Sequence, residues 1–245
     1  MKYHFTSLST YRFLIFGLAL LSYMSHANNG GVHGPMVKAN SSQFDWRYTY
    51  VSSEEPGTSD IQASRLHYQQ SLNERFQVRL VGQYRQQPDW EYDSAKIELL
   101  YNFNKFNEQD NYASAIRFDM RTRKGSRPDD IAVHWTNQLN LDAKNYIRAI
   151  VLFGKNLSGE QSKNWRIGTR FSYYRRPNAN YQLGIELFDQ YGEVSNIAAY
   201  DDQRHQLGPA VMAKFGALQL YARYLAGLTD STPNHALSFR IGWNF

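Results

Sequence analysis

Arginine recurs at alternating positions in segments whose intervening residues are apolar. In residues 76–85, Arg79 and Arg85 alternate with Leu80 and Tyr84. A guanidinium group presents a planar fork of N–H donors that matches the oxygens of carboxylates and phosphates. If one face of a β-sheet collects such side chains, this spacing predicts a surface that attracts anions.

In each alternating segment, the apolar residues assign one face of the expected strand. The cations then lie on the opposite face. Fourteen cations take that face: Arg47, Arg65, Arg79, Arg85, Lys96, Arg117, Arg121, Arg148, Arg166, Arg170, Arg204, Lys214, Arg223 and Arg240. Four carboxylates share it: Asp45, Glu98, Asp119 and Glu186. Most other acidic residues, Asp93 and Asp130 among them, are assigned to loops. We therefore expect guanidinium groups without carboxylate partners, and nine residues are predicted to contact anions: Arg47, Arg65, Arg79, Arg117, Arg148, Arg166, Arg170, Arg223 and Arg240.

Histidine forms no clear catalytic or metal-binding pattern. Five histidines are scattered without the spacing of a ligand set: His33, His67, His134, His205 and His235. His134 and Thr136 come nearest to a base–hydroxyl arrangement, with threonine in place of serine. Ser64 lies three residues before His67 but on the opposite parity. No catalytic residue, cofactor or metal site is predicted.

Twelve segments with alternating polarity must position the cations. Their ranges are 43–51, 61–70, 76–85, 95–103, 112–120, 131–139, 146–154, 165–173, 181–187, 207–215, 218–226 and 237–245. Residues 146–154 are apolar on both parities, and we place Arg148 on the cation-bearing face. Pro209 cannot donate a ladder hydrogen bond, so we expect a bulge or kink there.

Strands with one apolar and one polar face fit a wall between lipid and water. A charge that faces hydrocarbon near the bilayer centre costs ~2–4 kcal/mol, which explains why the apolar face is nearly uncharged. An even strand number also places both termini on one side, and aromatic residues should form a girdle at that end. The girdle residues are Phe44, Phe76, Phe103, Tyr112, Tyr173, Tyr181, Phe215 and Phe245. The predicted fold is all-β: a transmembrane antiparallel β-barrel of about 12 strands over residues 42–245, with a soluble β-sandwich as the alternative.

The N-terminus has the features of a secretory signal. Lys2 and Arg12 precede a short apolar run, and Ser25-His26-Ala27 has the form of a cleavage site. Residues 1–27 are therefore predicted to be a cleaved signal peptide. Residues 28–41 are rich in Gly and Asn and are expected to be a flexible leader or a segment in the lumen. The absence of cysteine excludes an N-terminal lipid anchor, disulfides and thiolate metal ligands.

The ending Leu237-Ser238-Phe239-Arg240-Ile241-Gly242-Trp243-Asn244-Phe245 resembles the C-terminal signature of bacterial outer-membrane β-barrels. In that family the signature is recognised by the barrel assembly machinery, which makes Phe245 the expected assembly signal. The barrel size and the arginine-lined lumen also loosely resemble the oligogalacturonate- and sialic-acid-type porins. That resemblance implies passive passage of acidic oligosaccharides or other small anions, without identifying a substrate.

The predicted function is an outer-membrane channel for passive diffusion of small anionic solutes, with an anion-selective lumen. Two alternatives remain open: a structural barrel whose lumen is closed by cross-linked arginines, and a lipid-modifying barrel enzyme. The expected partners are outer-membrane lipid and lipopolysaccharide, the barrel assembly machinery and small anionic solutes. Nucleic acid is not expected, because the pI of about 9.2 is attributed to the lumen rather than to an exterior patch.

Overall fold

The computed structural model describes residues 30–52, 60–86, 89–104 and 110–245. The predicted signal peptide, residues 1–27, lies outside these residues. Within them no helix is long and apolar enough to cross a membrane. The only helical element assigned there is a 3-10 helix at Tyr200–Asp202.

Twelve long strands carry the fold, each ten to thirteen residues long. Their bounds are β1 Ser42–Val51, β2 Ile61–Ser71, β3 Phe76–Gln86, β4 Trp90–Asn102, β5 Tyr112–Arg123, β6 Asp130–Asn140, β7 Asn145–Asn156, β8 Arg166–Arg175, β9 Tyr181–Glu193, β11 Arg204–Phe215, β12 Leu218–Gly227 and β13 His235–Asn244. A two-residue strand, β10 (Asn196–Ile197), pairs only with β9. The twelve predicted segments all correspond to strands.

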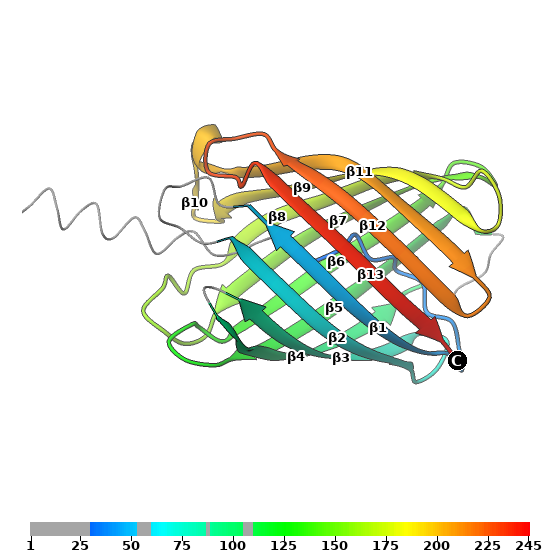
Figure 1. Ribbon diagram of the computed structural model, residues 1–245, viewed down its shortest axis with the longest axis horizontal. Coiled ribbons are helices and arrows are strands. Elements are labelled where there is room, and N and C mark those ends of the chain that lie inside the picture. Colours follow the sequence, from blue (N-terminus) through cyan, green and yellow to red (C-terminus); the bar gives the residue numbers. More distant parts are fainter. Residues whose placement is uncertain (1–29, 53–59, 87–88, 105–109) are drawn as a thin grey trace, which may run out of the picture.

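The sheet closes on itself (Figure 1). Each long strand pairs antiparallel with its chain neighbours, β9 pairs with both β8 and β11, and β1 pairs with β13. At the seam, Gln43 faces Asn244 and Val51 faces Ala236. The prediction of a twelve-stranded antiparallel barrel is confirmed, and in the described part of the chain each long strand is paired on both edges.

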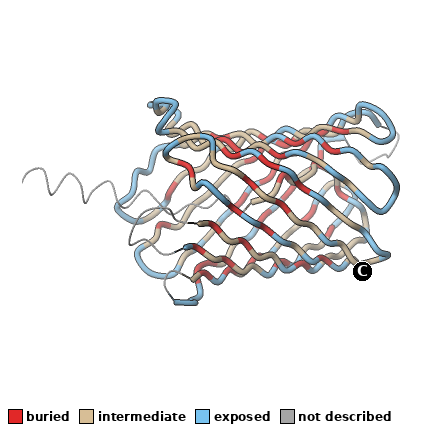
Figure 2. The backbone as a smooth tube through the Cα atoms, turned by 45° about the horizontal axis from the view of Figure 1, so that its top comes forward, coloured by how far each residue is buried: buried red, intermediate tan, exposed pale blue. Residues whose placement is uncertain are grey.

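Burial alternates along the strands as the sequence predicts (Figure 2). On β6, for example, Trp135 is exposed outward, whereas His134 and Thr136 are buried inside. On β7, Ala149 is exposed and Ile150 is buried, so Arg148 faces the lumen as predicted. The phase of all twelve segments is therefore correct, and it places the cations inside.

Aromatic side chains surround the end of the barrel where Ser42 and Phe245 meet. The eight predicted girdle residues are all exposed. Two of them, Tyr181 and Phe215, have ring centroids 6.2 Å apart in an edge-to-face arrangement. Aromatic rings at the rim of an apolar outer wall are typical of a membrane interface.

Pro209 interrupts the ladder without a bulge. The pairing of β11 with β12 is broken at Gly208 and Pro209 and resumes at Ala210 in the same register, while the pairing with β9 is continuous. Of the expected bulge or kink, the bulge is wrong: Pro209 has no N–H group to donate to β12, and the strands keep their register across the gap. Register shifts occur instead between Gln83 and Tyr84 and between Ile167 and Gly168.

The chain before β1 enters the barrel (Figure 1). Asn40 has a φ of 52°, a left-handed conformation that asparagine tolerates better than most residues, and it lies just before β1. From there residues 30–37 lie in the lumen. Val37 packs with Leu100 and Ala115, and Val32 belongs to a second buried apolar cluster.

Candidate functional site

The lumen holds a cavity of about 510 Å³ beside the N-terminal segment. Its lining includes residues 30–34 and lumen-facing side chains from all around the barrel. Among the described residues, ten cations line it: Arg47, Arg65, Arg79, Lys96, Arg117, Arg121, Arg148, Arg170, Arg223 and Arg240. Four carboxylates do so: Glu98, Asp119, Asp130 and Glu186. Of the nine predicted anion-contact residues, eight therefore meet at one cavity, and Arg166 lies outside it.

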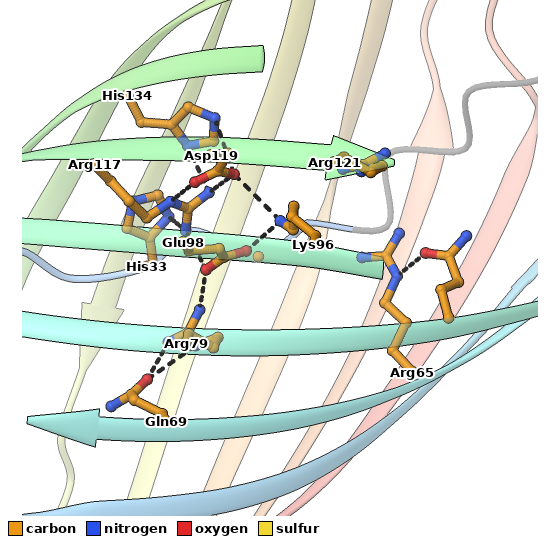
Figure 3. Close-up of polar contacts among 12 residues, drawn as sticks. His33, Arg65, Gln69, Arg79, Lys96, Glu98, Arg117, Asp119, Arg121 and His134 are labelled. Atoms are coloured by element: carbon orange, nitrogen blue, oxygen red, sulfur yellow. Dashed lines mark hydrogen bonds and ion pairs between the residues drawn. The ribbon is translucent and has the colours of Figure 1, made fainter. Parts of the chain in front are cut away.

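A network on β3, β4 and β5 holds three cations around two carboxylates, and we name it the Glu98 cluster (Figure 3). Arg79 donates to Glu98 at 2.9 Å, and Arg117 Nη1 lies 3.3 Å from the same carboxylate. Arg117 also forms a two-pronged contact with Asp119, at 2.7 and 2.8 Å. Lys96 contacts both acids. The cluster retains one surplus positive charge.

Two histidines complete this network (Figure 3). His134 Nδ1 accepts a hydrogen bond from Arg117 at 2.7 Å, because a guanidinium group can only donate. His33 Nδ1 accepts from the same guanidinium at 3.1 Å. The two imidazole rings are 5.5 Å apart. Arg117 is thus bound by two acids and by two neutral imidazole acceptors.

A second network centres on Glu186 of β9, and we name it the Glu186 cluster. Its carboxylate is buried and accepts hydrogen bonds from Tyr174 at 2.6 Å, Tyr221 at 2.8 Å and Arg223 at 3.0 Å. Arg223 also donates to Ser238 at 3.2 Å. The Glu186 carboxylate thus has one cation and two hydroxyl donors from the wall of the barrel as partners.

The expectation of unpaired guanidinium groups is wrong for four of the nine residues. Arg79, Arg117 and Arg223 belong to the clusters above, and Arg47 donates to Asp45 at 2.6 Å. Asp45 is two residues from Arg47 on the same strand face, a spacing at which long side chains meet.

The other five predicted residues contact neutral groups. Arg65 donates to Gln83, Arg148 to Gln138 at 2.7 Å, and Arg166 to Asn156 at 2.7 Å. Arg170 donates to the Gly31 carbonyl at 3.0 Å, and Arg240 lies over the Tyr221 ring. These contacts orient the guanidinium groups.

Two acids that the sequence assigned to loops belong to strands instead. Asp93 lies in β4, is fully buried, and contacts Arg127 and Gln83. The register shift opposite Gln83 brings it inward, and a one-residue irregularity of this kind leaves no clear signal in the sequence. Asp130 is the first residue of β6 and pairs with Arg123 at 2.9 Å.

The hydroxyl–imidazole pairs considered from sequence do not assemble. Thr136 donates to the His33 carbonyl at 3.0 Å rather than to His134. Ser64 accepts from Trp46 on the outer face, whereas His67 is buried inside. Within residues 30–52, 60–86, 89–104 and 110–245, no group of three or more His, Asp or Glu side chains is arranged to hold a metal ion.

No family model matches the chain, and no curated protein matches it in sequence. Solved structures do resemble it. The KdgM porin superposes with a TM-score of 0.61 at 12% identity, over 83% of this chain and 99% of that one. The NanC porin gives a TM-score of 0.56 at 12% identity, over 82% and 98%. The COG4313 outer membrane channel from Pseudomonas putida F1 gives 0.63 at 13% identity, over 88% and 99%.

Identity this low shows a shared fold and nothing finer. The resemblance to the small oligosaccharide porins, based on barrel size and lumen charge, is confirmed at the level of fold. The chain has the architecture of outer-membrane β-barrels over nearly the full length of those channels.

Proposed function

We propose that this chain forms an outer-membrane channel through which small anionic solutes diffuse. The observation that carries the proposal is the charge of the lumen cavity, where ten cations face four carboxylates. Inside a low-dielectric wall, surplus positive charge focuses the field and raises the local anion concentration. Rings of Arg and Lys serve the same purpose in known anion pores.

The structural neighbours support a channel rather than an enzyme. Two of them are porins, and KdgM was also solved in complex with disordered oligogalacturonate. By analogy, acidic oligosaccharides are one solute class for this lumen. The proposal includes export by the signal peptide of residues 1–27 and insertion by the barrel assembly machinery. It also includes contact of the outer wall with lipid and lipopolysaccharide.

A closed structural barrel is the second candidate. It is favoured by the carboxylate partners of Arg47, Arg79, Arg117 and Arg223, and by the presence of residues 30–37 in the lumen. The two candidates differ in one measurable property, since only the channel conducts ions.

Planar-bilayer recording of the purified protein tests the proposal. We expect discrete current steps whose reversal potential in a potassium chloride gradient favours chloride. Arg65→Gln with Arg240→Gln should shift the reversal potential toward potassium. A unit charge about 4 Å from a passing ion contributes about 1 kcal/mol in water, a factor of roughly five in local anion concentration. Both arginines contact neutral groups, Gln83 and the Tyr221 ring.

Lys144→Gln serves as the matched control, because Lys144 is exposed in the turn between β6 and β7, away from the cavity. Its reversal potential should equal that of the unaltered protein. A silent bilayer would favour the structural barrel, and hydrolysis of lipid by the same preparation would favour the enzyme.

A further inference from the structure

Three consecutive carbonyl groups of the N-terminal segment are held by three arginines from three strands. The Gly30 carbonyl accepts from Arg223 of β12 at 3.1 Å. The Gly31 carbonyl accepts from Arg170 of β8 at 3.0 Å. The Val32 carbonyl accepts from Arg148 of β7 at 3.4 Å. The backbone thus presents a short row of oxygens to a row of guanidinium groups.

The next residues continue the same mode of binding. The His33 carbonyl accepts from Thr136, and its Nδ1 accepts from Arg117. The Pro35 carbonyl accepts from Asn102 at 2.7 Å. Residues 28–41 contain no Asp or Glu, so every acceptor that this segment offers is neutral.

Neutral acceptors are weak partners for arginine. An ionised oxygen adds the Coulomb attraction of opposite charges to the hydrogen bond, which a neutral carbonyl oxygen cannot supply. Among the described residues, Arg148 and Arg170 have no carboxylate partner; their hydrogen-bond acceptors are Gln138 and the carbonyls of Val32 and Gly31. Arg170 and Arg223 also lie near one ring, 5.6 and 4.6 Å from the centroid of Phe188.

We propose that residues 30–34 occupy an oxyanion site formed by Arg148, Arg170 and Arg223, and that a small oxyanion displaces the segment from it. The carbonyl oxygens occupy the positions that the anion's oxygens take. This inference rests on the proposed function, because it states how anions open their own path through the lumen. It predicts a channel that is partly filled at rest and is freed by its solute.

Glycine lets the segment lie against these arginines. A methyl group at Gly30 would lie 2.5 Å from Arg170 Nη1, and one at Gly34 would lie 2.9 Å from Arg148 Nη2. A methyl group at Gly31 would meet no atom within 4 Å. Gly30→Ala and Gly31→Ala are therefore a matched pair: the first must push Arg170 away, and the second leaves the contact intact.

The absence of cysteine permits a direct test on the full chain. Val32→Cys places a thiol on a residue that is only 6% exposed in the docked segment. The experiment measures how fast a small neutral methanethiosulfonate reagent labels this thiol in liposomes, with sodium sulfate or sodium chloride at equal ionic strength. Sulfate should accelerate labelling relative to chloride, because its several oxygens can bridge neighbouring guanidinium groups.

Three variants in the Val32→Cys background sharpen the result. Arg170→Gln should speed labelling about 2- to 10-fold in chloride, the factor that one net hydrogen bond is worth, and should reduce the response to sulfate. Gly30→Ala should also speed labelling, whereas Gly31→Ala should leave it unchanged. As a control, a separate variant carries Lys38→Cys in place of Val32→Cys. Its thiol replaces an exposed side chain and should be labelled at the same rate in both salts.

Labelling does not require conduction, so the two proposals fail separately. Equal labelling rates in sulfate and chloride, together with anion-selective currents, would overturn displacement and leave the channel standing. Sulfate-dependent labelling in a barrel that carries no current would support displacement and overturn the channel. Faster labelling of Gly31→Ala than of Gly30→Ala would contradict the proposed contact with Arg170.

Discussion

Glu186 binds three donors from two strands of the wall, Tyr174 of β8 and Tyr221 and Arg223 of β12, while only 1% of its surface is exposed. A carboxylate taken out of water is tolerated when a cation and further donors satisfy it. Arg223 supplies that charge, and the hydroxyls of Tyr174 and Tyr221 supply the remaining hydrogen bonds. Removal of the carboxylate leaves the buried Arg223 charge without this counter-ion.

Glu186→Ala should therefore destabilise the barrel by about 3–5 kcal/mol, since it leaves Arg223 without its carboxylate. Tyr221→Phe, which removes one hydrogen bond to the same carboxylate, should cost roughly 1–3 kcal/mol. Urea unfolding in lipid vesicles, followed by tryptophan fluorescence, measures both. Equal stability of Glu186→Ala and the unaltered protein would show that water in the lumen already satisfies Arg223.

The face of each lumen residue could be predicted from sequence, because a strand has a strict two-residue period. The partner of each residue could not. Arg79 and Glu98 lie directly opposite each other on β3 and β4, which becomes apparent only when the register is known. The contacts of Arg148 and Arg170 with residues 30–34 are harder still, because carbonyl acceptors are present in every residue and have no sequence signal.

The strands show how an element accommodates a residue that cannot pair. Pro209 lacks an N–H group, and β11 loses two rungs to β12 there without changing register. At Gly208, the residue before the proline, the backbone of β11 lies very close to that of β12. A methyl group added at Gly208 would collide with the Tyr224 carbonyl. The sequence identified the proline as irregular, but the form of the irregularity depends on this close approach.

Gly208→Ala should weaken the β11–β12 pair and lower the folded yield, with a loss of about 1–3 kcal/mol as in other overpacked sites. Gly82→Ala is the matched control, because the added methyl group meets no atom within 4 Å. The fraction that migrates as the compact, unheated form on gel electrophoresis reports folding. If both variants fold equally well, β12 can move to accommodate the added methyl group, and the close approach at Gly208 does not limit folding.

At the scale of the whole molecule, the first and last strands, β1 and β13, close the ring. The backbones of Phe245 and Ser42 exchange two hydrogen bonds of 3.0 Å, and the Phe245 ring is 66% exposed. The strand count, the closure and the lipid-facing wall all followed from alternation, since one period fixes both the fold and its outer face. The path of residues 30–37 through the lumen could not be predicted in this way. Their Gly- and Asn-rich sequence is equally compatible with a flexible leader.

Deletion of Phe245 should lower the amount of folded barrel in cells, since it removes the proposed assembly signal together with two seam hydrogen bonds. Phe245→Ala separates the causes, because it keeps the backbone pairing and loses only the ring. A ring that serves as the assembly signal should make Phe245→Ala as deficient as the deletion. Phe215→Ala, at an exposed aromatic of the same rim, should be nearly normal. Heat-modifiable migration of membrane extracts measures all three.

The position of residues 30–34 has a consequence for the order of folding. Ring closure joins residues as distant as Thr49 and Ser238, which are 189 positions apart, and contacts so remote in sequence form slowly. The side chains that bind residues 30–33 belong to β5, β6, β7, β8 and β12. This binding site is therefore complete only after the C-terminal half of the barrel has formed. Residues 30–34 precede all twelve long strands in the sequence, yet they are among the last of the described residues to reach their native place.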